Sequence, residues 1–286
     1  MDIEQIKDIY PMGLTSVALP HDDFSLLPLF TKNNIGLMEV TPLVPDNKEW
    51  TAGDPDSTKK FLALCETNNL TPESVHCFFL DSLGHDVADK DPVVRKTAIA
   101  LNKVLFQGAK DIGAKYMVAH LYGWNVEGRS EDETMSLARD VILGYLPEAE
   151  RTGIKIAIEN LFEDWAVTHI NQLIDGIDHP LLGICFDTGH AAVYGDVEKE
   201  LRLCGNRLIG LHIHDNHFLK DEHFVPFRGK IDWKAFTSAL ADIGYKGPLM
   251  LESYVRNDGE DFDSHFGECA QAYKKLTEFI LEDFDA

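Results

Sequence analysis

The sequence is poor in basic residues relative to acidic ones. Its 286 residues include 26 lysines and arginines against 48 aspartates and glutamates, so the formal net charge is −22 at pH 7. Proteins that bind nucleic acid or anionic membranes use lysine and arginine to neutralise phosphate groups. A local basic patch is compatible with this total, but we expect no nucleic-acid partner and no membrane partner.

Cysteine is also scarce, and the few cysteines are scattered. The chain contains five of them, an odd number, without a Cys-X-X-Cys pair. Small secreted domains held by disulfides are short and rich in cysteine, so this class is excluded. We expect reduced thiols in the core of a cytoplasmic protein. The five residues are Cys65, Cys77, Cys185, Cys204 and Cys269.

Long hydrophobic runs, an apolar leader and low-complexity linkers are missing as well. The chain begins Met1-Asp2-Ile3-Glu4, unlike the basic and apolar start of a signal peptide. No stretch approaches the roughly 18 uncharged apolar residues that a membrane helix needs. With 44% hydrophobic residues the chain is nonetheless apolar enough to bury a large core. We therefore expect residues 1–286 to form a single soluble domain.

The sequence does contain a repeated alternation of a short apolar run with a helical stretch. The runs are rich in valine, isoleucine, leucine and methionine and alternate poorly, as expected for parallel strands that are covered on both faces. The eight runs are Leu14–Leu19, Ile35–Val40, Ser74–Phe79, Tyr116–Leu121, Ile154–Ile158, Leu182–Phe186, Leu208–Ile213 and Pro248–Leu251.

Amphipathic segments between the runs have the start and stop signals of helices. In the segment 91–110, Asp91 followed by Pro92 supplies a capping residue and a first-turn proline. Glycines at 113, 153 and 244 stand where helices are expected to end before the next strand. The apolar residues that fall on one face of segment 91–110 are Val94, Ala98, Leu101 and Leu105.

Eight strand-helix units predict a closed (β/α)8 TIM barrel. A barrel of this kind runs to about 250 residues, which suits the length of the chain. An open doubly wound sheet is the alternative, but no Gly-X-Gly-X-X-Gly motif follows the first run.

Ionisable residues lie at the ends of six successive runs, from the third to the eighth. In a TIM barrel the active site is built from the carboxyl ends of the strands and the loops that follow them. The candidates in or after these runs are His76, His120, Glu159, Asp187, His190, His212, His214, Asp221, His223 and Glu252.

Each candidate taken alone also has an ordinary structural explanation. A single histidine in an apolar segment, such as His76, is more often a hydrogen-bonded core residue than a ligand. Asp187 could cap the helix that follows it. Glu159 and Glu252 are harder to explain in this way, because a buried carboxylate without a cation is costly.

Independent accidents would not place ionisable groups at one end of six successive strands. Two glutamates, an aspartate and a histidine that converge there make an oxygen-rich site with four ligands. Such a set suits one divalent metal per chain, with Mn²⁺, Zn²⁺, Mg²⁺ and Co²⁺ as the candidate ions.

Four further residues are weaker candidates for substrate binding. Glu39 ends the second run, with a helix cap or a surface position as the alternative. Trp124 could wall a sugar pocket or pack against loops. His214 lies in the loop after the seventh run, where exposed polar residues are common. Arg228 in the same loop could bind a phosphate or carboxylate, or form a surface ion pair.

Six stretches of the chain resemble the xylose isomerase-like TIM barrels, a superfamily of sugar (phosphate) isomerases and epimerases that also includes the endonuclease IV-type AP endonucleases. Each stretch is weak alone, but their order and spacing together are specific. They span most of the chain from His76 onward. The stretches are Ile156–Asn160, Phe186–His190, Leu211–Asn216, Asp221–His223, Gly229–Trp233 and Gly247–Glu252.

By this resemblance, Glu159, Asp187, His212 and Glu252 look like the metal ligands of the epimerase branch. In that branch the two glutamates also exchange protons with the substrate. The resemblance therefore implies a metal-dependent sugar or sugar phosphate isomerase or epimerase that acts through a metal-stabilised enediolate. The partner of such an enzyme would be a small carbohydrate. Members of this superfamily are often homodimers or homotetramers, so either state is possible for this chain.

The nine ligand positions of the endonuclease branch are matched as well, so the alternative is an AP endonuclease or phosphodiesterase with a multi-zinc site. That reading places a second or third ion, or else substrate, at His76, His120, His190, Asp221 and His223.

Charge favours the sugar branch over the nuclease. The segments 81–86, 161–165 and 217–222, which follow the third, fifth and seventh runs, carry acidic residues that would repel a DNA backbone. Phe224 stands where ketose epimerases carry an arginine, and Phe227 stands where a glycine is usual. These two differences disfavour a ketose 3-epimerase and leave the isomerase class. A non-catalytic sugar- or metal-binding barrel would give no reason for two facing carboxylates.

Overall fold

A sheet of eight parallel strands forms the centre of the molecule. The computed structural model describes residues 2–20, 23–42, 45, 50–80, 86–121, 128–161, 165–255 and 261–285. The strand order is β7-β6-β5-β4-β3-β2-β1-β8, so strands that are consecutive in the chain are neighbours, and β1 also pairs with β8. The strands are β1 (Met12–Thr15), β2 (Leu37–Val40), β3 (Thr71–His76), β4 (Tyr116–Ala119), β5 (Lys155–Glu159), β6 (Leu182–Asp187), β7 (Leu208–His212) and β8 (Leu249–Leu251).

One backbone contact brings the two ends of this sheet together. Ile213, directly after β7, forms a parallel bridge with Leu251 of β8. The Ile213 N–H donates to the carbonyl of Met250 at 2.9 Å, and the Glu252 N–H donates to the carbonyl of Ile213 at 3.0 Å. The strands therefore form a nearly closed barrel, which confirms the predicted (β/α)8 TIM barrel.

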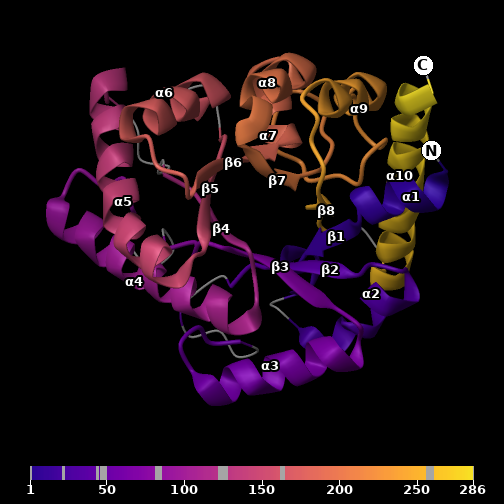
Figure 1. The fold of residues 1–286 in the computed structure, drawn as a ribbon, viewed down its shortest axis with the longest axis horizontal. Helices are drawn as coiled ribbons and strands as arrows, with labels where there is room; N and C mark the ends of the chain where they lie inside the picture. Colours follow the sequence, from indigo (N-terminus) through magenta and orange to yellow (C-terminus); the bar gives the residue numbers. More distant parts are fainter. Residues whose placement is uncertain are drawn as a thin grey trace.

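Helices surround the strands on the outside (Figure 1). The first and last helices pack against each other at one side of the barrel, close to both chain ends. The helices are α1 (Ile3–Ile9), α2 (Pro28–Lys32), α3 (Pro55–Thr67), α4 (Pro92–Ile112), α5 (Glu131–Thr152), α6 (Val167–Ile177), α7 (Thr188–Tyr194), α8 (Val197–Cys204), α9 (Trp233–Asp242) and α10 (Phe262–Asp285). Among the described residues, no helix is both long enough and apolar enough to cross a bilayer.

Local signals set the helix ends as expected. The Asp91 carboxylate accepts a hydrogen bond from the Val93 N–H at 2.8 Å at the start of α4. Gly113 and Gly153 end α4 and α5 in the left-handed conformation, each with a φ of 79°. A side chain at either glycine would be strained, so these two positions define where the chain turns back toward the barrel.

All eight predicted runs coincide with strands but differ from them in their bounds, and the first and third runs differ most. The first run continues to Leu19, but β1 ends at Thr15 and a short 3₁₀ turn covers Ser16–Ala18. The third run reaches Phe79, whereas β3 begins earlier, at Thr71, and ends at His76. Leu19 and Phe78 are nevertheless buried. Both belong to the main hydrophobic core, so the apolar run extends beyond the end of the strand.

The period of the strands decides which side chains enter the barrel. Successive residues of a strand point to opposite sides. Ala157 of β5 and Cys185 of β6 belong to a small buried cluster that is separate from the main core. Glu159 and Asp187 follow them by two residues on the same strands, so they point into the same interior at its carboxyl end. All five cysteines are buried and free, as expected for core thiols.

Candidate active site

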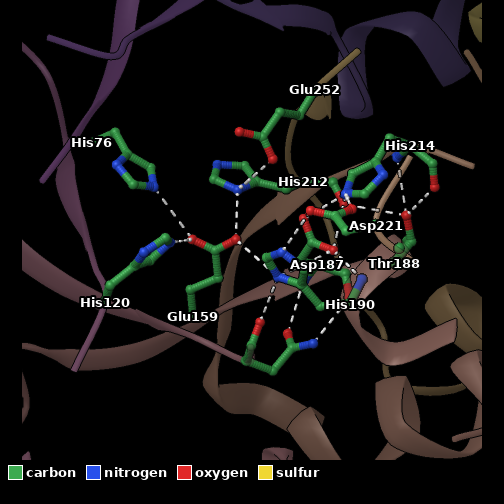
Figure 2. A network of polar contacts seen from close by, with 12 residues as sticks. His76, His120, Glu159, Asp187, Thr188, His190, His212, His214, Asp221 and Glu252 are labelled. Carbon is green, nitrogen blue, oxygen red and sulfur yellow. Dashed lines mark hydrogen bonds and ion pairs between the residues drawn. The ribbon is translucent and has the colours of Figure 1, made fainter. Parts of the chain in front are cut away.

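Four acidic and basic side chains converge where β5 to β8 end (Figure 2). They are Glu159, Asp187, His212 and Glu252, and one ligand atom from each lies within 4.8 Å of the others. All four are buried. Three carboxylates and an imidazole form a donor set that suits a divalent cation. The residues that the sequence predicts as a metal set therefore come together in space, at the predicted end of the barrel.

His212 stands between the two glutamates of this set. Its Nδ1 lies 3.0 Å from Glu159 Oε1 and 3.2 Å from Glu252 Oε2. Its other ring nitrogen, Nε2, lies 3.0 Å from Glu39 Oε1. A histidine that binds a metal through one nitrogen commonly donates its other N–H to a carboxylate, which fixes the orientation of the ring. Glu39 is placed to do this for His212.

Glu39 is fully buried rather than at the surface, which corrects the surface alternative for this residue. Its second oxygen accepts a hydrogen bond from Ser74 Oγ at 2.6 Å. A shift in the pairing of β2 with β3 leaves Glu39 opposite Ser74 rather than Glu73. This irregularity follows Pro72, which has no N–H for a regular ladder. Ser74 is a member of the site that sequence reasoning missed.

Two more histidines approach Glu159 from the side of β3 and β4. His120 Nε2 lies 2.8 Å and His76 Nε2 lies 3.4 Å from Glu159 Oε2. The two imidazoles meet edge to face, with ring centroids 4.7 Å apart. Glu159 thus contacts His76 and His120 through Oε2 and His212 through Oε1.

A third group of possible ligands, separate from His76 and His120, consists of His190, Asp221 and His223. His223 Nε2 is 2.7 Å from Asp221 Oδ2, and His190 Nε2 is 3.4 Å from the same oxygen. The ligand atoms of His190, Asp221 and His223 are close enough together to hold an ion. Asp221 Oδ1 is buried and has no hydrogen-bond partner among the described residues, so this group has unused ligand capacity.

Asp187 serves two purposes at once. It is the capping residue of α7, because its Oδ1 accepts a hydrogen bond from the His190 N–H at 2.6 Å. Its own backbone is held by Asn160, whose Oδ1 accepts from the Asp187 N–H at 2.8 Å and whose Nδ2 donates to the Asp187 carbonyl at 3.0 Å. The helix-cap interpretation and the ligand interpretation of Asp187 are therefore compatible.

The loop between β7 and α9 is organised by Asp215, a second residue without a role in the sequence interpretation. Its buried carboxylate accepts hydrogen bonds from four donors at 2.9–3.1 Å, which are the backbone N–H groups of Asn216, Phe227 and Ile231 and the indole Nε1–H of Trp233. This loop carries Asp221 and His223. An aspartate three residues after the end of β7, at the start of a long loop, was the available signal.

The pKa values of Glu159 and Glu252 are held low, so these two buried carboxyl groups are ionised. Burial acts to raise the pKa of Glu159, but His212 and His120 outweigh it and hold that pKa well below its ordinary value. Burial also opposes ionisation of Glu252, and His212 with His223 again keeps the pKa of this carboxyl low. Both glutamates can therefore act as ligands and as proton acceptors at neutral pH.

The pKa values of His212 and His190 shift in the opposite direction, upward. Burial disfavours the cation of His212, but the acidic groups around it raise its pKa well above the ordinary value. The same balance between burial and the carboxylates of Asp187 and Asp221 raises the pKa of His190 to about 10. In the metal-free protein, positive charge on these rings thus compensates the carboxylates. A divalent cation can take over this role, with release of protons.

The other weaker candidates for substrate binding are His214, Arg228 and Trp124, of which the structure describes the first two. His214 is fully buried and contacts Asp187, and is not an exposed loop residue. Arg228 forms an ion pair with Glu268 of α10 at 2.6 Å. Trp124 lies outside the described residues, as do segments 81–85 and 162–164 of the acidic loops. Phe227 stands where the resemblance leads us to expect a glycine. Its φ of 78° lies in the left-handed region, which glycine adopts more easily than other residues.

Comparison with known proteins places this site in a family. A model of the xylose isomerase-like TIM barrel matches residues 32–279. The D-psicose 3-epimerase of Ruminiclostridium cellulolyticum is 27% identical over 188 residues, 62% of this chain and 62% of that protein. The L-ribulose-5-phosphate 3-epimerase UlaE of Shigella flexneri is 25% identical over 260 residues, 85% and 87% of the two chains. An inosose isomerase of Bacillus licheniformis is 29% identical over 163 residues, 53% and 58%.

Some of these matches are partial. The chain spans 53% and 63% of the length of two uncharacterized relatives, from Sinorhizobium fredii and Methanocaldococcus jannaschii, that are each 30% identical to it. Two solved structures share the fold over nearly the whole chain. A D-tagatose 3-epimerase-like protein has a TM-score of 0.79 at 21% identity and covers 96% of this chain and 98% of its own. The IOLI protein with a binding zinc atom has a TM-score of 0.76 at 19% identity, with 96% and 99% covered.

The relatives include sugar epimerases and isomerases. The family model spans most of the barrel, from α2 to α10, and includes every residue of the site described above. The chain therefore belongs to the xylose isomerase-like TIM barrel family.

Proposed function

We propose that the chain is a divalent-metal-dependent isomerase or epimerase of a small sugar or sugar phosphate, acting by proton abstraction through an enediolate. The observation that carries this proposal is the pair of ionised glutamates on either side of His212. Glu159 and Glu252 each approach His212 Nδ1 to within 3.2 Å. Two carboxylates that face each other at one reaction centre can take a proton from one side and return it from the other.

The ion would be held by Glu159, Asp187, His212 and Glu252. Mn²⁺, Zn²⁺, Mg²⁺ and Co²⁺ all suit three carboxylates and an imidazole. When bound, such an ion supplies a Lewis acid that stabilises negative charge on adjacent oxygens of a hydroxy-carbonyl substrate. The IOLI protein, a solved structure of the same fold, is described with a binding zinc atom, which supports a metal site in this fold.

The residues of the chain supply the proton chemistry. One glutamate accepts the proton from the carbon next to the carbonyl, and the other returns a proton. Return to the opposite face of the same carbon gives an epimer, and return to the neighbouring carbon gives an isomer. His76, His120, His190, Asp221 and His223 surround this centre and would orient substrate hydroxyls or hold a second ion.

Exchange of substrate hydrogen with solvent tests the roles of Glu159 and Glu252. We expect Glu159→Gln and Glu252→Gln to remain folded and to lose at least about 100-fold in the rate of solvent deuterium incorporation, because the amide cannot accept a proton. The assay is mass spectrometry of a panel of ketoses, aldoses and their phosphates incubated in deuterated buffer with Mn²⁺. The matched control is His217→Gln, which changes a half-exposed histidine of the β7–α9 loop and should leave the exchange rate unchanged. Exchange at the wild-type rate in both glutamine variants would overturn the assignment.

A second candidate function rests on the three adjacent ligand groups. Together these groups provide enough ligands for more than one ion. They are His76 and His120 beside Glu159, the set of four proposed ligands, and His190 with Asp221 and His223. A multi-zinc site of this kind would suit hydrolysis of a phosphodiester. The net charge of −22 and the acidic residues Asp221 and Glu222 beside the site disfavour a DNA substrate.

Metal content separates the two candidates. We expect about one divalent ion per chain by elemental analysis of protein purified without chelator, which supports the isomerase site. Two or three zinc ions per chain would contradict this expectation, and cleavage of abasic DNA by such a preparation would establish the nuclease. No metal after reconstitution would remove the proposed mechanism altogether.

A further inference from the structure

We infer that His214 is a positioning residue, whose Nε2–H holds the Asp187 carboxylate in the orientation that the metal set requires. This inference rests on the proposed metal site and concerns a residue outside its four ligands. His214 follows β7 by two residues and is fully buried. Figure 2 shows its imidazole facing Asp187 from the side opposite Glu159.

The contact between His214 and Asp187 engages both carboxylate oxygens. His214 Nε2 lies 2.9 Å from Asp187 Oδ2 and 3.1 Å from Oδ1. The other ring nitrogen, Nδ1, is buried and has no hydrogen-bond partner among the described residues. The proton is therefore best placed on Nε2, where it has an acceptor, while a bare lone pair at Nδ1 is the less costly group to leave unpaired. His214 thus acts as a donor to Asp187.

The backbone around His214 is built to hold this ring in one place. Thr188, the first residue of α7, donates its hydroxyl to the carbonyl of His214 at 2.7 Å. The N–H of His214 lies 3.0 Å from the same hydroxyl oxygen and donates to it. Thr188 is the residue directly after Asp187. One side chain therefore ties the start of α7, and with it Asp187, to the segment that carries His214.

Gly189 provides the space for the imidazole. A Cβ at this position would lie 1.9 Å from Cε1 and 2.4 Å from Nδ1 of His214, far inside van der Waals contact. Gly189 lies within α7, where alanine would otherwise be favoured over glycine. The clash shows that the position of the His214 ring against α7 depends on glycine at 189.

The ring of His214 also makes a stacking contact. His214 stacks on His223, with ring centroids 4.0 Å apart and planes at 15°. His223 in turn stacks on Tyr254 at 4.1 Å and 15°. His214 therefore has two separable functions in the fold, a hydrogen bond to Asp187 and a packing contact with His223. A purely structural role would depend on the packing contact alone.

Two substitutions separate these functions. His214→Gln can place an amide N–H near the position of Nε2 but removes the stacked ring. His214→Phe keeps the ring and removes the donor. If the donor matters, we expect His214→Phe to bind metal about 10- to 100-fold more weakly than the wild type, which is the usual effect of removing a partner of a metal ligand. We expect His214→Gln to stay within a few-fold of the wild type.

The measurement is a competitive titration of the metal-free proteins with Mn²⁺ and with Zn²⁺ against a fluorescent chelator, without substrate. Thermal unfolding of each metal-free protein reports folding separately. His217→Phe removes a histidine of the same loop that contacts Glu222 and not Asp187, and we expect wild-type affinity from it. Gly189→Ala, which displaces the ring without changing it, should weaken metal binding as His214→Phe does and covers the case in which His214→Phe does not fold.

Three results would overturn the inference. Wild-type affinity in both His214→Phe and Gly189→Ala would show that the donor is dispensable. A weaker affinity in His214→Gln than in His214→Phe would assign the effect to packing. A wild-type protein that binds neither ion would overturn the proposed function, and this inference with it, whereas the first two results leave the proposed function standing.

Discussion

At the scale of single residues, the site depends on groups that do not themselves face the reaction centre. Glu39 is such a group, because it is fully buried between the Nε2 of His212 and the hydroxyl of Ser74. It comes from β2, on the far side of the barrel from β7. Its carboxylate is placed to fix the ring plane of His212, and in the proposed metal site this contact would make the opposite nitrogen a better ligand.

Removing this carboxylate should weaken metal binding without unfolding the protein. We expect Glu39→Ala to lower the affinity for Mn²⁺ or Zn²⁺ by about 10- to 100-fold. It should also destabilise the metal-free protein by roughly 1–3 kcal/mol, because the Nε2–H of His212 is left buried without an acceptor.

Competitive metal titration and denaturant unfolding measure the two effects. Ser74→Ala is the matched control, since it removes only the hydroxyl donor to Glu39, and its effect on metal affinity should be smaller. Equal metal affinities for wild type and Glu39→Ala would show that His212 needs no carboxylate behind it.

At the scale of elements, the loop between β7 and α9 supplies a whole side of the site. Within it, Asp215 and Phe224 form an antiparallel bridge. His223 and Phe227 have φ angles of 47° and 78°, an uncommon conformation for residues other than glycine. Backbone in such conformations persists only where surrounding contacts hold it. One of the four hydrogen bonds to Asp215 comes from the Phe227 N–H and holds this residue, and the others hold the loop on both sides of it.

Replacing Asp215 by asparagine should therefore release the loop. Asparagine has one acceptor oxygen, and its NH₂ group would face an N–H donor, so at least one buried hydrogen bond is lost. We expect destabilisation by about 3 kcal/mol and faster amide hydrogen exchange in residues 216–231. Hydrogen-exchange mass spectrometry measures the latter directly.

Asp232→Asn provides the control for this change. Asp232 caps α9 by accepting from the N–H groups of Lys234 and Ala235, both at 3.1 Å. Asparagine is as good a capping residue as aspartate, so little change is expected. Similar exchange rates in Asp215→Asn and Asp232→Asn would contradict the organising role of Asp215.

At the scale of the whole molecule, the barrel concentrates buried charge at one end. Metal binding should therefore be coupled to both stability and pH. A ligand that binds only the folded state at about 100 times its Kd adds about 2.7 kcal/mol of stability. For 286 residues, the entropy of unfolding converts this to a rise in Tm of about 4–5 °C.

The pH dependence of this rise has a definite sign. The pKa of His212 is raised well above its ordinary value in the metal-free protein, so the ring carries a proton that the metal must displace. Metal affinity therefore increases as pH rises. We expect a larger metal-induced shift in Tm at about pH 8 than at about pH 6. Calorimetry of metal-free and Mn²⁺-loaded protein measures it, and a shift that is equal or smaller at the higher pH would contradict the assignment of His212 as a ligand.

Local patterns were enough to predict the architecture and the end of the barrel that carries the site. Few folds accommodate short apolar strands that alternate with capped amphipathic helices. With eight such strand-helix units, the fold that fits is a closed parallel barrel. The two-residue period of a strand then aligns Glu159 with Ala157 and Asp187 with Cys185 on the interior side. The convergence of Glu159, Asp187, His212 and Glu252 could therefore be predicted, because the direction of parallel strands collects their carboxyl ends at one end of the barrel.

The tertiary structure decided which side chains touch, because closing the barrel joins residues that no local pattern relates. The contact between Glu39 and His212 spans 173 positions of the chain. The burial of His214 against Asp187 depends on Gly189 of α7, and the role of Asp215 depends on a loop that folds back over it. A sequence pattern records the preference of each residue for strand, helix or turn. Partners across a closed barrel follow from its curvature and strand register, which the whole chain determines together.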